Sequence, residues 1–326
     1  MIKEIDFKDI AGVSIGNAQD DKAKKGGTVL LFKDGAKTGV CISGGGPASR
    51  ETPVLDPTKE DIGIHAIVLS GGSAFGLAAG DGVMECLEKH NIGFDTTVAL
   101  VPLVVQSSIF DLAYGTNKVR PDSAMGALAC ENALKGNNPQ SGNVGAGVGA
   151  TVGKILGMEQ ADKAGIGYYA LELGNLKMGA VVVVNALGDI YSPTTYEKIA
   201  GLKTLDRKGF LDSEEELYKV RSLAQTPPRS NTTIGAVVTN GNFNKAELTK
   251  IATMATNAYG RCIKPVATMA DGDTIYASSC GSLVSADLDL AGSLARKVME
   301  KAIENAILSS RISDEEYLRN CVKVEK

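Results

Sequence analysis

Short apolar runs that end in glycine or turn residues recur through the first two thirds of the chain. Residues 40–47 and 67–72 each predict a strand that ends in a glycine turn, and the second continues as a small-residue helix through about Glu88. Residues 180–184, Ala-Val-Val-Val-Val, predict a further strand that ends in the turn of residues 185–189. The pattern therefore indicates a protein built from both strands and helices.

The last third of the chain combines one strand with two helices. Residues 244–259 have helical spacing, with Leu248, Ile251 and Ala255 on one face and Asn244 as a plausible N-cap. Residues 285–308 carry a continuous apolar stripe, which predicts a helix packed on a sheet.

A candidate hidden N-terminus lies between these regions. Residues 230–240 read Ser-Asn-Thr-Thr-Ile-Gly-Ala-Val-Val-Thr-Asn, so a polar pair leads into a hydroxyl residue that opens an apolar strand. If the chain cuts itself between Asn231 and Thr232, the new amino group lies beside the Thr232 hydroxyl and can act as its base. An ordinary strand entry is the alternative, because Asn favours turns and Thr favours strands.

The segment before this bond changes character. Residues 202–229 are rich in charge, predict a short helix at most and end near Pro227 and Pro228, as expected of an exposed, cleavable connector. Its position makes self-cleavage at Asn231–Thr232 our leading hypothesis.

Three other segments carry candidate polar chemistry. The glycine-dense residues 141–154 end in Lys154, which places one cation beside closely packed backbone. Asn185, at a strand end, is either an oxyanion donor or an ordinary turn residue. Asp271 and Asp273 flank Gly272 before a strand and can hydrogen-bond a reactive amine or hydroxyl, whereas calcium binding is a weaker interpretation because the rest of an EF-hand loop is missing.

The glycine turns at residues 44–46 and 71–72 allow two interpretations. A glycine turn that leads into a helix can present N–H groups to an anion, but neither a Gly-Lys-Ser/Thr ending nor a Gly-x-Gly-x-x-Gly pattern is present. Close packing of a helix on a sheet is the alternative that we favour.

Composition narrows the setting. A chain of 326 residues forms one large domain or two ordinary ones, and 44% hydrophobic residues suffice for a substantial core. The formal charge of −4 is spread along the chain, so we expect a small or peptide-like ligand and no nucleic acid. The N-terminus lacks the apolar core of a signal peptide and no run reaches membrane-spanning length, so we expect a cytoplasmic protein without membrane association.

Cysteine and histidine point away from metal chemistry. The six cysteines are scattered without a Cys-x-x-Cys pair, and His65 and His90 show no recognisable metal or triad spacing. We therefore expect a histidine-independent site without a metal or cofactor.

Taken together, these segments resemble the self-processing L-aminopeptidase/D-Ala-esterase/amidase family, with the β-peptidyl aminopeptidases and the nylon-oligomer hydrolase as its relatives. The resemblance covers nearly the whole chain. It rests on residues 10–17, on the glycine blocks 44–52 and 69–77, and on the Asn-Thr-Thr-Ile-Gly of residues 231–235.

The resemblance implies an α+β fold, a single four-layer αββα sandwich over residues 1–326, processed into residues 1–231 and 232–326. It implies Thr232 as nucleophile, Asn185 as oxyanion donor, and Lys154 as the lysine near the nucleophile. Asp271 and Asp273 match the Asp-x-Asp of the nylon-hydrolase branch, where the β-peptidyl aminopeptidases carry Ser-x-Glu. Asp111 is a candidate for binding the free amine of a substrate.

The implied activity is that of an aminopeptidase acting on small peptides or amides, in a homotetramer of processed protomers. Two alternatives stay open at this point. One is an acyltransferase of the ornithine-acetyltransferase type, although its Lys-Gly-x-Gly-Met is replaced here by Pro228-Arg229-Ser230-Asn231. The other is a non-enzymatic glycine-rich binding protein.

Overall fold

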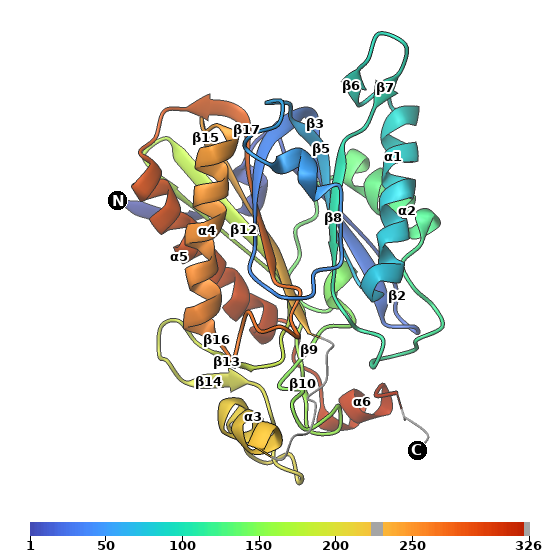
Figure 1. Ribbon diagram of the computed structural model, residues 1–326, viewed down its shortest axis with the longest axis vertical. Coiled ribbons are helices and arrows are strands. Elements are labelled where there is room, and N and C mark those ends of the chain that lie inside the picture. The colour runs from blue at the N-terminus through green and yellow to red at the C-terminus, as the bar shows by residue number, and fades with distance from the viewer. Residues whose placement is uncertain (223–230, 323–326) are drawn as a thin grey trace.

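One long strand, β3 (Lys25–Ile42), joins two stacked sheets in the computed structural model, which describes residues 1–222 and 231–322 (Figure 1). Its first half, residues 25–31, pairs with β2 (Ser14–Asp20) and β5 (Ile64–Ser70). Its second half, residues 37–42, pairs with β17 (Thr274–Val284). Between the two halves the register with β5 shifts, and the strand passes from one layer to the other.

The first sheet has the strand order β1-β11-β12-β15-β17-β3, and the second has β2-β3-β5-β8-β4. The strands not yet given are β1 (Ile2–Ile5), β4 (Ser49–Arg50), β8 (Val104–Ser108), β11 (Ile166–Leu173), β12 (Leu176–Asn185) and β15 (Thr232–Gly241). β15 is antiparallel to β12 and parallel to β17. Parallel neighbours need a crossover connection, which the helix between β15 and β17 provides.

Helices cover the outer face of each sheet. α4 (Lys245–Cys262) and α5 (Leu288–Leu308) lie on the first sheet, and α1 (Ala79–Lys89) and α2 (Ser123–Lys135) lie on the second (Figure 1). The predicted α+β four-layer αββα arrangement is confirmed. Among the described residues, no helix is both long enough and apolar enough to cross a membrane.

The continuous apolar run in β12 follows from its place in these layers. Val181, Val182, Val183 and Val184 are all fully buried, because one face of the strand meets α5 and the other meets the second sheet. Burial of each such side chain contributes about 1.5–3 kcal/mol. The Ser107 and Tyr276 hydroxyls lie 2.7 Å apart and link the two sheets with a buried polar contact.

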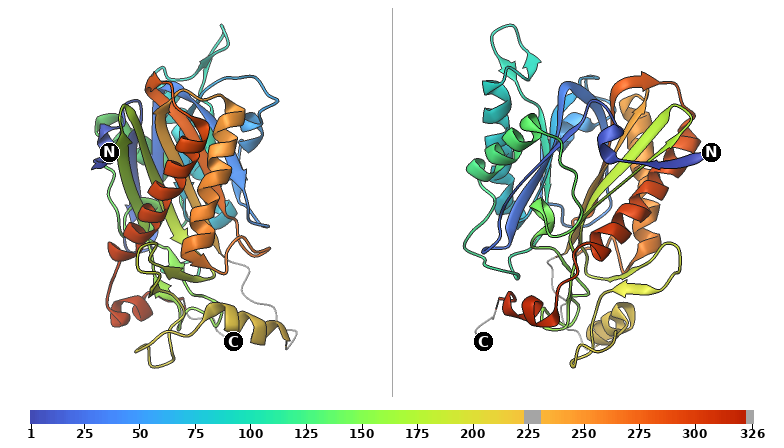
Figure 2. Two further views of the ribbon diagram at one scale, coloured as in Figure 1. Left: turned by 90° about the vertical axis from the view of Figure 1, so that its left-hand side faces the viewer. Right: turned by 180° about the vertical axis from the view of Figure 1, so that it is seen from behind.

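The remaining elements are β6 (Phe94–Asp95), β7 (Leu100–Val101), β9 (Thr151–Val152), β10 (Asp162–Lys163), β13 (Asp189–Tyr191), β14 (Lys198–Ala200), β16 (Ile263–Lys264), α3 (Ser213–Ser222), α6 (Asp314–Arg319) and the short 3-10 helices Phe7–Asp9, Thr52–Leu55, Ser73–Ala78 and Gly145–Gly147. Of these elements, β9, β10, β13, β14, β16, α3 and α6 gather at one end of the sheets, and the hairpin β6–β7 lies at the opposite end (Figures 1 and 2).

Over its described part, residues 202–222, the predicted exposed connector is largely exposed, with Leu205 86% and Tyr218 60% exposed, but it is anchored to the fold at several points. Leu202 and Ser213 are fully buried, and the buried Asp189 carboxylate accepts hydrogen bonds from both of their backbone N–H groups. Arg207, a charged residue of this segment, forms an ion pair with Asp314. Charge on this segment serves internal contacts, which sequence composition alone does not distinguish from solvation. Residues 223–229 lie outside the described part of the chain.

Candidate active site

The Asn231–Thr232 bond lies at the start of β15 and is buried. Asn231 is 2% exposed and Thr232 is 5% exposed. Pairing between β12 and β15 places Thr232 directly opposite Asn185. In the uncut chain, the Thr232 hydroxyl donates a hydrogen bond to the Asn231 carbonyl oxygen. The hydroxyl therefore lies against the peptide bond that precedes it.

The Asp-Gly-Asp segment forms the other side of this bond. Asn231 forms a parallel bridge with Asp271, and the Gly272 N–H donates to the Asn231 carbonyl oxygen at 3.0 Å. A Cβ atom at position 272 would lie 2.9 Å from the Thr232 hydroxyl oxygen, closer than such atoms approach in proteins. Glycine is thus required by the close approach of this loop to Thr232.

Both aspartates are held by hydrogen-bond donors. Asp273 accepts from the Thr233 N–H at 2.6 Å and from the Ala267 N–H at 3.0 Å, one on each carboxylate oxygen. Asp271 accepts from the Thr268 N–H at 2.8 Å and from the Thr268 hydroxyl at 2.6 Å. Within residues 1–222 and 231–322, neither aspartate belongs to a group of three candidate metal ligands. The arrangement is that of an organising loop around Thr232.

Burial sets the protonation of the charged groups at this site. Burial and the neighbouring Asp271 raise the pKa of Asp273 to about 7, and burial also raises the pKa of Asp271. Burial lowers the pKa of Lys154 to about 7, against the opposing attraction of Asp271, Asp111 and Asp273. A lysine with such a pKa is in part a neutral amine at neutral pH and can take a proton from a hydroxyl.

Lys154 and Asn185 are hydrogen-bonded to each other, and Asn185 is also hydrogen-bonded to Phe110. The Lys154 ammonium donates to the Asn185 carbonyl oxygen at 2.9 Å. The Asn185 side chain is fully buried; its oxygen accepts from the Thr151 N–H at 3.1 Å and its nitrogen donates to the Phe110 carbonyl at 2.9 Å. An amide nitrogen carries two hydrogens, so Asn185 has a donor beyond the Phe110 contact.

Asp111 has partners within the chain, and its assignment to the free amine of a substrate stays a prediction. Its side chain is fully buried, with one oxygen 3.7 Å from the Lys25 ammonium and accepting from the Gly72 N–H at 2.8 Å. A Cβ atom at Gly71 would collide with the same carboxylate. The second oxygen of Asp111 has no hydrogen-bond partner within the described residues. Asp111 thus serves as an internal anion for the 71–72 glycine turn, which also answers the anion-binding interpretation of that turn.

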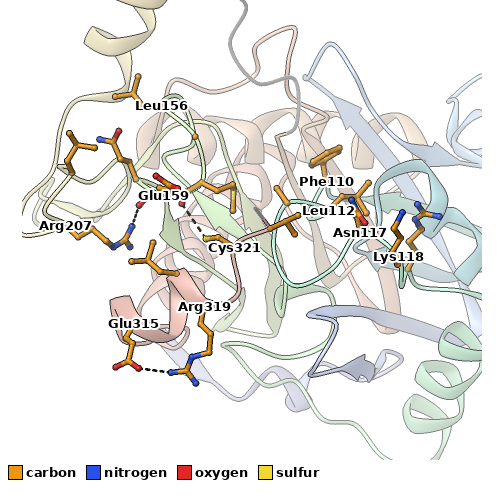
Figure 3. A pocket seen from close by; sticks show the side chains of 18 residues that line it. Phe110, Leu112, Asn117, Lys118, Leu156, Glu159, Arg207, Glu315, Arg319 and Cys321 are labelled. Atoms are coloured by element: carbon orange, nitrogen blue, oxygen red, sulfur yellow. Dashed lines mark hydrogen bonds and ion pairs between the residues drawn. The ribbon is translucent and has the colours of Figure 1, made fainter. Parts of the chain in front are cut away.

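A cleft of about 1650 Å³ opens beside these residues (Figure 3). Phe110, whose carbonyl accepts from Asn185, lines the cleft, and so does Leu156, two residues beyond Lys154. Arg207, Glu315 and Arg319 line the part near α6. Thr232, Asn185, Lys154, Asp271 and Asp273 are themselves buried and do not line the cleft.

Thr232, Asn185, Lys154, Asp271 and Asp273 are thus brought together from four separate stretches of sequence, and Asp111 is among the carboxylates that act on Lys154. Sequence reasoning missed the Gly272 N–H and the Phe110 carbonyl. A glycine between two carboxylates was the signal available for Gly272, and a backbone carbonyl leaves no sequence signal at all.

A four-layer αββα sandwich with a buried hydroxyl at a strand start is the architecture of N-terminal-nucleophile hydrolases, and comparison with solved structures supports this fold. L-aminopeptidase D-Ala-esterase/amidase from Ochrobactrum anthropi, titled a variant of that fold, matches with a TM-score of 0.65 and 17% identity over 95% of this chain and 92% of that chain. A Burkholderia β-aminopeptidase matches with a TM-score of 0.61 and 17% identity, covering 93% and 84% respectively.

Sequence comparison identifies the family. Residues 6–316 match Peptidase family S58, and the chain belongs to this family. It is 35% identical to an uncharacterized aminopeptidase of Mycobacterium leprae over 292 residues, 84% of this chain and 78% of the relative. It is 32% identical to a 6-aminohexanoate-oligomer endohydrolase of Paenarthrobacter ureafaciens over 323 residues, 91% of this chain and 84% of the relative. The chain is therefore a peptide or amide hydrolase.

The position of Asn185 generates a first prediction. Asn185→Ala should lower kcat for amide hydrolysis roughly 10²–10³-fold, the usual effect of removing one oxyanion donor. Asn240→Ala is the matched control, because Asn240 lies at the end of β15 far from Thr232. This variant should keep the turnover of the wild type. Initial rates on an aminoacyl p-nitroanilide, together with thermal unfolding to monitor the lost Thr151 and Phe110 contacts, measure both variants. Full turnover by a folded Asn185→Ala protein would remove the oxyanion assignment.

Proposed function

We propose that the chain is a self-processing amidohydrolase that cuts its own Asn231–Thr232 bond and then hydrolyses small peptides or amides through an acyl-enzyme on Thr232. One observation carries the proposal. The Thr232 hydroxyl contacts the carbonyl of the bond to be cut, and the Gly272 N–H already donates to that same oxygen. Nucleophile and oxyanion donor thus converge on one buried peptide group.

Self-cleavage needs a base before any free amine exists. We assign this role to Lys154, which donates a hydrogen bond to the carbonyl of Asn185, the cross-strand partner of Thr232. The neutral Lys154 amine takes the hydroxyl proton as the oxygen attacks the Asn231 carbonyl carbon. The Gly272 N–H stabilises the oxyanion while the C–N bond breaks, and the departing nitrogen receives the proton.

This step leaves an ester between the Asn231 carbonyl and the Thr232 oxygen. Water then attacks the ester carbonyl, the C–O bond breaks, and the Thr232 oxygen recovers a proton. The products are residues 1–231 with a new carboxylate and residues 232–326 with a free amino group on Thr232.

Turnover of substrate repeats the chemistry with this new amine as the base. The Thr232 oxygen attacks the substrate amide, Asn185 donates to the oxyanion, and the leaving amine departs protonated. Water then hydrolyses the acyl-enzyme and returns Thr232 to its starting state. Asp271 and Asp273 hold the loop and the Thr233 backbone, and so orient the new amine towards the hydroxyl.

The substrate is proposed as a small peptide or a linear amide oligomer. Support comes from the relatives named as aminopeptidases and as a 6-aminohexanoate-oligomer endohydrolase, and from the Asp-Gly-Asp sequence at residues 271–273. A cleft of about 1650 Å³ also exceeds the roughly 300–1,000 Å³ typical of sites for single small ligands, so it accommodates an oligomer.

Removal of the nucleophile tests self-cleavage. Thr232→Ala should yield one full-length chain, whereas the wild type should yield fragments 1–231 and 232–326 by denaturing mass spectrometry. Thr233→Val is the matched control, because the Thr233 hydroxyl has no hydrogen-bond partner within the described residues and its backbone contact to Asp273 is kept. Fragments of unchanged mass from Thr232→Ala would show that Thr232 does not cut the chain.

The pKa of Lys154 predicts how processing depends on pH. A base with a pKa of about 7 is about one tenth neutral at pH 6 and about nine tenths neutral at pH 8, so cleavage should accelerate about tenfold between these values. The precursor is made by cell-free synthesis and transferred to buffer at pH 6 or pH 8. The loss of full-length chain with time on a denaturing gel gives the cleavage rate. Lys154→Arg, which stays protonated, should process slowly at both pH values. A wild-type cleavage rate that is the same at pH 6 and pH 8 would exclude Lys154 as the base.

The aspartate loop gives a further prediction. In Asp271→Asn the remaining amide oxygen can still accept both Thr268 donors, so stability should be retained while turnover falls on the order of 10²-fold. Asp273→Asn should lose activity as well as stability, because both Asp273 oxygens accept N–H groups and one would face an NH₂ group instead. Thermal unfolding and kcat, measured on the same samples, separate an effect on stability from an effect on turnover. Wild-type kcat in Asp271→Asn would show that its charge is dispensable.

A further inference from the structure

A second cluster of reactive side chains lies on the outer helical layer, away from Thr232. Cys86 and His90 are four residues apart, Cys86 within α1 and His90 as its C-terminal cap, so they lie one turn apart on the same face. Glu131 projects from the neighbouring helix α2. The sequence analysis found no metal spacing around His90, because the third member of the cluster comes from a different helix.

The atoms of this cluster are spaced as metal ligands are. The Cys86 sulfur lies 3.8 Å from the Glu131 oxygen Oε1, and the His90 nitrogen Nε2 lies 2.9 Å from the same oxygen. All three ligand atoms lie within 4.8 Å of one another. In a tetrahedral zinc site with ordinary bond lengths, sulfur to oxygen is about 3.5 Å and nitrogen to oxygen about 3.3 Å. The two distances to the Glu131 oxygen thus differ from those of a zinc site by a few tenths of an ångström.

We propose that Cys86, His90 and Glu131 form a zinc-binding site that links α1 to α2. Thiolate, imidazole and carboxylate are the ligand types that zinc takes in proteins, and three protein ligands leave the fourth position for water or a further donor.

The surroundings suit a cation held at the protein surface. Cys86 is 2% exposed, whereas the His90 and Glu131 side chains are 43% and 34% exposed, so a metal ion can enter from solvent. Zinc binding by Cys86 releases the thiol proton to solvent. Lys135 lies 3.7 Å from the other oxygen of Glu131 and does not occupy the shared oxygen Oε1.

The site is placed for stability and not for catalysis. The hairpin β6–β7, which follows α1, lies at the opposite end of the molecule from β9 and β10, near which Lys154 lies (Figure 1). A bound ion would join the last turn of α1 to the middle of α2, both of which pack on the second sheet.

Cobalt(II) titration of the purified wild-type protein tests the proposal, because thiolate ligation gives an intense sulfur-to-cobalt absorption band. We expect one equivalent of Co²⁺ to produce the band and Zn²⁺ to abolish it by displacement. Cys86→Ala should lack the band, and His90→Gln and Glu131→Gln should weaken affinity by at least about tenfold, since even outer-shell partners of metal ligands cost 10–100-fold. Cys321→Ala, which removes a half-buried thiol elsewhere, is the control and should bind as the wild type does.

Two outcomes would overturn the site: no sulfur-to-cobalt band in the wild type, or a band that persists in Cys86→Ala. A second readout is thermal unfolding, where Zn²⁺ should raise the midpoint of the wild type and leave His90→Gln unchanged. Equal stabilisation of both proteins would also contradict the proposal. EDTA should lower the unfolding midpoint of zinc-loaded protein without changing amide hydrolysis, so this result is independent of the chemistry at Thr232.

Discussion

The structure depends on the backbone pairing that fixes Thr232 from two sides. On one side β12 places Asn185 opposite Thr232, and on the other the loop before β17 places the Gly272 N–H on the Asn231 carbonyl. Neither contact would exist if β15 shifted by one residue, because such a shift turns every side chain to the opposite face of the sheet. The buried valines of β12 and the helix that connects β15 to β17 hold this register, so the core of the fold also positions the candidate nucleophile.

Burial gives the same site its chemistry. Charges removed from water become costly, so Lys154 tends towards its neutral form and Asp273 towards its protonated form near neutral pH. The uncut peptide group, its hydroxyl and its base thus share a dry environment in which hydrogen bonds to a developing oxyanion are strengthened. The same burial keeps Asn231–Thr232 away from external proteases, which favours cleavage by the chain itself.

Much of this arrangement could be predicted from sequence, and the limits have physical causes. The strand from Thr232, the helix after Asn244 and the Asp271–Asp273 loop depend on local patterns, and local patterns are legible in sequence. The proximity of Lys154 to Asn185 depends on a tertiary contact between a glycine-rich segment and a strand end, and only the family resemblance pointed to it. The pairing of Asp111 with Lys25, 86 residues away, likewise depends on a tertiary contact that no local pattern indicates. Residues 202–222 are largely exposed, as their charge indicated, but their anchoring contacts, such as the ion pair of Arg207 with Asp314, join distant residues and leave no local pattern.

The central claim is that Thr232 is both the site of self-cleavage and the catalytic nucleophile. It is tested most directly by intact-mass analysis and peptide mapping of purified wild-type protein after brief incubation with a slowly hydrolysed activated ester. The account predicts a 232–326 chain whose N-terminal residue is Thr232 and which carries the acyl group on that residue. An acyl group on the 1–231 chain, or a new N-terminus at any other residue, would contradict it.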